Sequence, residues 1–79
     1  MPLINVKLID GVFTPDQKTQ IIERLTDAMV EIEGENTRLT VWCLIEEVAN
    51  GEWGIGGQTF ISDDVKALAR ARPAPADDR

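Results

Sequence analysis

The residue with the most distinctive chemistry in this 79-residue sequence is Pro2. If Met1 is removed, Pro2 presents a secondary amine, and α-amino groups titrate at about 7.7 to 8.0 before any desolvation. An apolar environment disfavours the charged ammonium and lowers that pKa, which suits the amine to act as general base and then as general acid. Because the sequence has no His and no Tyr, few other groups can move protons near pH 7. The alternative interpretation is that proline is only a common second residue.

The remaining candidates for chemistry are carboxylates and one thiol. Glu52 and the pair Glu46-Glu47 are expected at a turn and a strand end, where charged side chains are usually solvated. Cys43 lies within a predicted apolar strand and is interpreted as a small buried hydrophobe rather than a nucleophile. One cysteine and no histidine exclude an internal disulfide and the usual zinc sites, so no metal site is expected.

Length and charge limit the class of protein. A chain of 79 residues forms one domain, which is predicted over residues 1–72. Below about 80 residues one hydrophobic core seldom stabilises the fold without disulfides, a metal or association with other subunits. Of these, association with other subunits is the one that this composition allows. The net charge of −6 repels phosphate backbones and anionic lipid, so neither nucleic acid nor a membrane is an expected partner. With no membrane-length apolar run and no signal-peptide layout, a cytoplasmic location is expected.

The first predicted elements are a strand and a helix. Pro2 to Ile9 alternates between two faces, which is typical of a strand. Thr14-Pro15-Asp16-Gln17 reads as an N-cap, a proline at the first helical position and a glutamine that can close a capping box. Helical spacing of apolar residues then predicts a helix from Pro15 to about Glu33, which Gly34 ends.

A second strand is predicted from Leu39 to Glu47, after a turn at Asn36-Thr37. Strand, helix and strand form a βαβ unit, so the two strands should be parallel. Both faces of the second strand are apolar, but one helix covers only one face of a two-stranded sheet. The other face is therefore expected to meet another subunit.

The C-terminal third begins with four glycines between Gly51 and Gly57, which predict a tight hairpin or bulged ribbon. A phosphate-binding loop would need a following Lys and Ser/Thr and a helix at the glycines, and the sequence has neither. Thr59 to Ile61 is predicted to be a short strand, and Ser62 to cap a helix over Asp63 to Ala71. The Pro-, Ala- and charge-rich tail, Pro73 to Arg79, is expected to be disordered.

Four segments together carry a resemblance to a known family: Met1-Pro2-Leu3-Ile4-Asn5-Val6, Asp10-Gly11, Asp16-Gln17-Lys18 and Gly51-Glu52-Trp53-Gly54-Ile55-Gly56-Gly57. Over residues 2 to 61 the chain resembles the 4-oxalocrotonate tautomerase family of the tautomerase superfamily. The resemblance implies an α/β (α+β) fold: a β-α-β protomer with a C-terminal ribbon, assembling as a hexamer, a trimer of dimers. It also implies that an amino-terminal proline moves a proton between atoms of an enol or keto acid, without a cofactor.

Carried over residue by residue, the resemblance assigns the catalytic role to Pro2. Trp53 falls where the family usually has the aromatic that lines the pocket. The family's two substrate-binding arginines would align with Val12 and Trp42, so both are absent. Ile55 stands where the hydratase-like dehalogenases of the superfamily carry a carboxylate, which disfavours that activity.

Without the two arginines, a dicarboxylate substrate is not favoured. Arg38, or Lys7, is the candidate for a cation reaching the site from another direction. The predicted substrate-binding residues are otherwise apolar: Trp53, Trp42, Val12 and Phe13. If these lie near Pro2, the site suits an aryl or alkyl enol acid, or a monoacid, better than a dianion. The alternative function is an inactive oligomeric scaffold that binds a hydrophobic ligand or partner. A family member that had lost its catalytic activity would also lack the two substrate-binding arginines.

Overall fold

The computed structural model describes residues 1–70. Its elements, in chain order, are β1 (Leu3–Ile9), α1 (Pro15–Glu33), the 3₁₀ helix η1 (Glu35–Thr40), β2 (Trp42–Val48), β3 (Trp53–Ile55), β4 (Gln58–Phe60) and α2 (Ser62–Arg70). The predicted disordered tail, residues 73–79, and the last two residues of the predicted domain lie outside the described residues.

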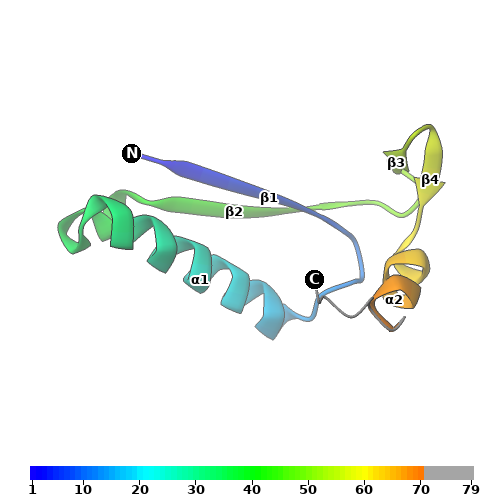
Figure 1. Ribbon diagram of the computed structural model, residues 1–79, viewed down its shortest axis with the longest axis horizontal. Helices are drawn as coiled ribbons and strands as arrows, with labels where there is room; N and C mark the ends of the chain where they lie inside the picture. Colours follow the sequence, from blue (N-terminus) through cyan, green and yellow to red (C-terminus); the bar gives the residue numbers. More distant parts are fainter. Residues whose placement is uncertain (71–79) are drawn as a thin grey trace, which may run out of the picture.

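β1 and β2 pair in parallel and α1 crosses between them, so the predicted βαβ unit is confirmed (Figure 1). The register places Leu3 opposite Trp42 and Ile9 opposite Val48. The Asp10 N–H extends the ladder by donating to the Val48 carbonyl at 2.9 Å. The two strands form a long, narrow ribbon with Pro2 at one end.

α1 has the boundaries that its capping residues predict. Thr14 Oγ1 accepts from the Gln17 N–H at 3.1 Å, and Gln17 Oε1 accepts from the Thr14 N–H at 2.9 Å, which completes the capping box. Pro15 occupies the first turn, where its missing N–H leaves no bond unmade. At the other end Gly34 adopts a φ of 113°, which a side chain would disfavour, and its N–H donates to the Val30 carbonyl at 2.7 Å.

The predicted strand from Leu39 to Glu47 is wrong at both ends, because β2 begins at Trp42 and ends at Val48. The segment before it is η1, in which two threonine hydroxyls bond to the backbone. Thr37 Oγ1 donates to the Gly34 carbonyl and Thr40 Oγ1 to the Thr37 carbonyl, each at 2.7 Å. Such local bonds offer the backbone an alternative to the sheet ladder.

The glycine-rich segment forms the predicted hairpin, in which β3 and β4 are antiparallel. Gly56 and Gly57 make its turn with φ values of 59° and 85°, as a two-residue turn with positive φ at both positions requires. The short strand comprises Gln58–Phe60 rather than the predicted 59–61. α2 begins at Ser62, one residue before the predicted start, and its predicted last residue, Ala71, lies outside the described residues.

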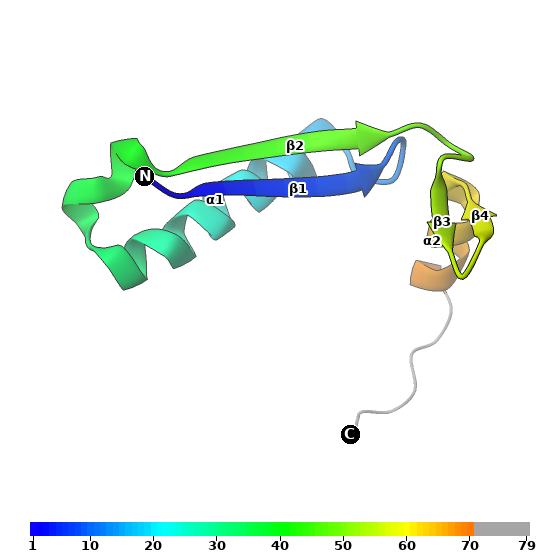
Figure 2. The same ribbon diagram turned by 90° about the horizontal axis from the view of Figure 1, so that it is seen from above.

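The fold is open rather than compact. α1 lies against one face of the β1–β2 ribbon and leaves the other face uncovered, while the hairpin and α2 lie beyond the end of the ribbon opposite the N-terminus (Figure 2). Ile9 and Val30 are the hydrophobic residues buried among those described. The Cα radius of gyration is 15.6 Å, against about 11 Å for a compact domain of 70 residues. Within residues 1–70, no helix is both long enough and apolar enough to cross a membrane.

Candidate active site

Pro2 lies at the open end of the ribbon, immediately before β1. It is half-buried, and its carbonyl accepts a hydrogen bond from the Trp42 N–H at 3.0 Å, which places Pro2 beside the start of β2. Its nitrogen is in the peptide bond to Met1, which is 84% exposed. Trp42 lies on the uncovered face of the ribbon and is 54% exposed. The structure therefore brings two of the predicted site residues together at this end.

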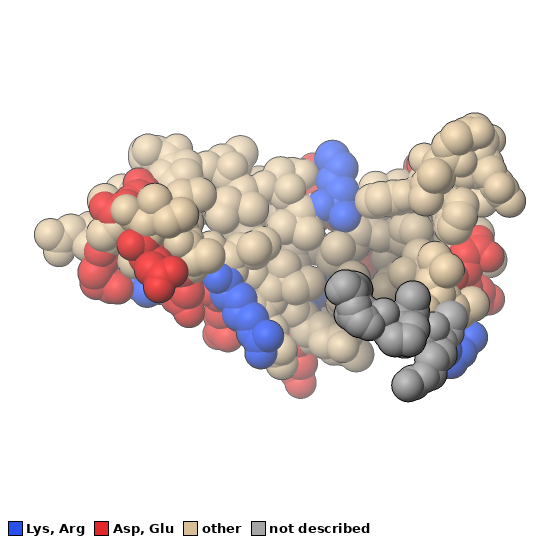
Figure 3. All heavy atoms as spheres, viewed as in Figure 1, with Lys and Arg blue, Asp and Glu red and all other residues tan. Residues whose placement is uncertain are grey.

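Arg38 lies at the same end, in η1, where two carboxylates hold its guanidinium. Its Nε donates to Glu35 Oε2 at 2.6 Å, its Nη2 to Glu35 Oε1 at 3.2 Å, and its Nη1 to Asp27 Oδ1 at 2.9 Å. The hydrogen bonds to Glu35 and Asp27 raise the pKa of Arg38 above its ordinary value, and the bond to Arg38 lowers the pKa of Glu35. Figure 3 shows acidic side chains gathered at this end of the molecule.

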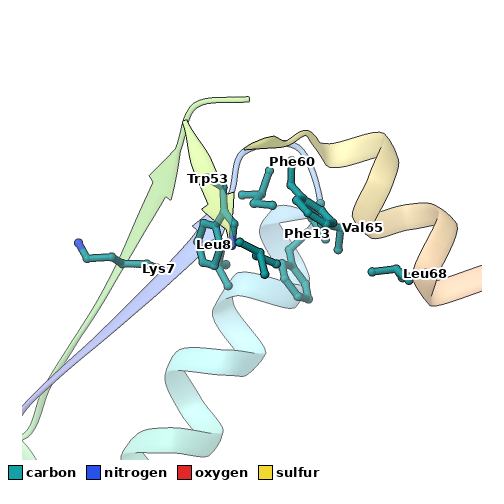
Figure 4. A pocket seen from close by; sticks show the side chains of 10 residues that line it. Lys7, Leu8, Phe13, Trp53, Phe60, Val65 and Leu68 are labelled. Carbon is teal, nitrogen blue, oxygen red and sulfur yellow. The ribbon is translucent and has the colours of Figure 1, made fainter. Parts of the chain in front are cut away.

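A pocket lies at the opposite end of the ribbon, between the end of β1, the hairpin and α2. Its volume is about 210 Å³. Three residues predicted for the site line it, namely Trp53, Val12 and Phe13. Figure 4 shows the rings of Trp53, Phe13 and Phe60 around the pocket, with Val65 and Leu68 reaching it from α2. The pocket lining is apolar except for Lys7, so a nonpolar group would fit it better than a charged one.

Lys7 is the polar residue of the pocket lining, and it contributes its aliphatic stem. Its ammonium points away from the apolar side chains (Figure 4) and pairs with Glu46 of β2. The hydrogen bond from Lys7 lowers the pKa of Glu46, with a smaller effect from Asn5. Lys7 therefore closes one side of the pocket with methylene groups and keeps its charge outside.

The structure thus divides the predicted site residues between two ends of the ribbon. Pro2, Trp42 and Arg38 lie at one end, and Trp53, Val12 and Phe13 at the other. From Leu3 to Ile9 the strand advances by about 20 Å, at roughly 3.3 Å per residue. A single tryptophan side chain does not span that distance, so the two groups do not meet within one chain.

Sequence reasoning missed several residues of the pocket. Lys7 was predicted only as an alternative cation, and the lining residues not predicted at all are Leu8, Ile9, Ile55, Phe60, Val65 and Leu68. For Val65 and Leu68 a signal was available, because apolar residues three positions apart share a helix face. For the strand residues the signal was ambiguous, since alternation alone does not say which end of a strand approaches a later hairpin.

A family model described as "Tautomerase enzyme" matches residues 2–61, starting at Pro2 and ending after the hairpin. Among curated proteins, a probable tautomerase of Helicobacter pylori is 38% identical over 62 residues, which are 76% of this chain and 90% of that protein. The match therefore covers nearly the whole of that relative.

Solved structures agree with the sequence comparison. A structure from a study of the 4-oxalocrotonate tautomerase isozymes of Methylibium petroleiphilum superposes with a TM-score of 0.66 at 36% identity, covering 87% of this chain and all of the other. TomN, a 4-oxalocrotonate tautomerase homologue of the tomaymycin biosynthetic pathway, gives a TM-score of 0.68 at 30% identity, covering 84% of this chain and 95% of TomN.

Proposed function

The chain belongs to the 4-oxalocrotonate tautomerase family and is an isomerase of that type, and from this premise we propose that Pro2, freed by removal of Met1, is its general base and acid. The substrate class is an enol or unsaturated acid that undergoes keto–enol or 1,3-proton transfer. The observation that carries the proposal is the family match, which begins at Pro2 in a sequence without His or Tyr.

The proton transfer that we propose needs only the amine and the substrate. The unprotonated secondary amine of Pro2 takes a proton from an enol hydroxyl or from the α-carbon. The resulting ammonium returns a proton to the carbon two bonds away from the atom that lost one, so the double bond shifts by one position without net oxidation, and no cofactor takes part. An apolar site favours the neutral amine and so brings its pKa closer to the working pH.

The apolar surroundings of Pro2 come, in this proposal, from a second copy of the chain. Within one chain, Pro2 and the aromatic pocket lie at opposite ends of the ribbon, so the pocket of one protomer must meet the Pro2 end of another. The uncovered ribbon face supports this assembly, because its nonpolar residues Leu3, Trp42 and Leu44 are 59%, 54% and 44% exposed. An isolated two-stranded sheet is marginal in water. The oligomer is a hexamer or a dimer, and the cytoplasmic location stays a prediction.

The carboxylate of the proposed substrate needs a cation to bind it. The positions of the two family arginines hold Val12 and Trp42, so a monoacid with a nonpolar substituent fits this chain better than a dianion. Arg38 is a cation at the Pro2 end, and its three hydrogen bonds to described residues use three of its five N–H donors. We therefore keep Arg38 as the candidate for binding that carboxylate.

Ketonisation of phenylenolpyruvate by protein whose intact mass shows Met1 removal tests the proposal. Pro2→Ala replaces the secondary amine with a primary one and keeps the carbonyl that pairs with β2, so fold and assembly should persist while turnover falls about 10²- to 10⁴-fold. Protein with a Gly-Ser extension before Pro2 is the matched control, because an acylated nitrogen has no basic lone pair and should be equally inactive. Equal turnover by all three proteins would overturn the role of Pro2. Tight binding of phenylpyruvate without turnover would favour the inactive scaffold.

A further inference from the structure

The helix α2 forms part of the pocket although it lies beyond the segment that the family model matches. That match ends at residue 61, and α2 begins at Ser62. Val65 and Leu68 nevertheless line the pocket together with Trp53 (Figure 4). One wall of the pocket is therefore built by a segment that the family match does not include.

The N-terminal end of α2 is tied to the loops next to the pocket. The Asn50 side chain bridges two loops: its Oδ1 accepts from the Ser62 N–H, and its Nδ2 donates to the Asp10 carbonyl at 3.4 Å. The Ile61 N–H donates to Asp64 Oδ2 at 2.9 Å, which closes the first turn of the helix. These bonds set the position of the α2 wall before any ligand arrives, so less ordering is needed on binding.

The size and lining of the pocket fit one aromatic ring. Its volume of about 210 Å³ exceeds the roughly 150 Å³ of an engineered cavity that binds benzene. Leu68 is 66% exposed although it faces this hollow, so in one protomer its apolar surface is left for a ligand to cover. The ammonium of Lys7 is paired with Glu46 outside the pocket, so the lining selects a nonpolar group rather than a carboxylate.

We propose that α2 sets the substrate specificity of this enzyme, with Val65 and Leu68 forming the wall on which a ring-sized nonpolar substituent of the acid packs. The inference rests on the proposed function, because it takes the pocket as the place where the substituent of the enol acid binds. Leu68 makes the larger contribution, since more of its surface is left to cover. Loss of its side chain should weaken binding of a phenyl-bearing acid and leave a short alkyl acid unaffected.

Calorimetric titration of the full-length protein with phenylpyruvate and with 2-oxobutyrate tests this specificity without requiring turnover. Leu68→Ala should weaken phenylpyruvate binding about tenfold and change 2-oxobutyrate binding by less than about twofold, as expected for lost contacts in an apolar pocket. The matched control is Lys66→Ala, a truncation on the same helix outside the pocket lining, and it should bind both acids as the wild type does.

The role of α2 is overturned if wild-type protein does not prefer phenylpyruvate, if Leu68→Ala retains the preference, or if Lys66→Ala loses it equally. Failure of the proposed function looks different, because wild-type protein would then turn over phenylenolpyruvate no faster than Pro2→Ala does. Selective binding that depends on Leu68 without such turnover would support the α2 wall while contradicting the proton-transfer role of Pro2.

Discussion

The two ends of the β1–β2 ribbon carry different kinds of surface. At one end lie Pro2 and the ion-paired cluster of Arg38, Asp27 and Glu35, with acidic side chains around them. At the other end, the aromatic rings of the hairpin and of the β1–α1 loop surround an apolar pocket. In the proposed function, the first end supplies the amine of Pro2 as the proton-transferring group, and the second supplies apolar surroundings that would lower its pKa.

In the proposed function, one active site is divided between two surfaces of the same short chain. A parallel βαβ unit places the start of β1 and the end of β2 at opposite ends, and in this chain the hairpin follows β2 directly and lies far from the N-terminus. Two copies can bring these surfaces together where one copy cannot. In this account the uncovered ribbon face is what holds the copies in place.

The largest expected effect comes from separating the copies while leaving both ends intact. Leu44→Glu places a charge on the uncovered ribbon face, where burial of each leucine is worth about 1.5 to 3 kcal/mol. Sedimentation should show assembly weakened by about 100-fold or more, and turnover should fall with it. Gln20→Glu, with the same charge change on α1, should assemble normally. Full turnover by a dissociated Leu44→Glu protein would contradict the division of the site.

A smaller effect is expected from damage to the pocket end alone. Trp53→Ala removes an aromatic wall and should lower kcat/KM for phenylenolpyruvate by about 10- to 100-fold, with assembly unchanged. Trp53→Phe keeps a ring in the pocket and should retain most of the activity. Unaltered kinetics of Trp53→Ala in assembled protein would show that the pocket takes no part in the reaction.

A third comparison tests the local structure that positions Phe13 at the pocket end. Thr14→Ala removes half of the capping box and should lower the free energy of unfolding by about 1 kcal/mol. Thr19→Ala removes only an exposed bond to the Pro15 carbonyl and should change it by less than about 0.5 kcal/mol. Urea denaturation of the two variants measures the difference. Equal losses would mean that the cap adds nothing to stability.

The smallest effect concerns Lys7 and Glu46, which pair beside the pocket end of the ribbon. The ion pair lowers the pKa of Glu46, so its contribution to stability is present above the unfolded value, near 4.3, and is lost as the pH falls through the folded value. Lys7→Met should raise that pKa toward the ordinary range in a carboxyl NMR titration. Lys66→Met should leave it unchanged. An unaltered Glu46 titration in Lys7→Met would show that the pair does not form in solution.

Local sequence predicts correctly those elements whose first and last residues carry capping or turn signals that favour one structure only. α1 is bounded by its capping box and Gly34, and the hairpin by paired glycines, so both were predicted correctly. The start of β2 was not, because Leu39 lies between Thr37 and Thr40, whose hydroxyls donate to the Gly34 and Thr37 carbonyls and favour η1. Burial of Leu39 against the sheet would have favoured a strand at this position over η1. Leu39 is 95% exposed, so in one protomer the sheet buries almost none of its side chain.

The candidate site was predictable in composition but not in arrangement. Residue types and the family resemblance suffice to propose Pro2 and Trp53 for the site. Pro2 and Trp53 lie at opposite ends of one ribbon because of the chain topology. The sequence motifs alone do not indicate this arrangement. The contribution of α2 depends on the Asn50 bridge, a contact between segments far apart in sequence that no local pattern predicts.

Mixing two impaired variants tests the division of the site most directly. Pro2→Ala keeps an intact pocket, and Trp53→Ala keeps an intact amine. After unfolding and joint refolding, sites shared between copies should recover, so a 1:1 mixture should reach roughly a quarter of wild-type turnover if subunits of a symmetric oligomer pair at random. Turnover that remains the average of the two separate variants would contradict the account, because each site would then lie within one chain.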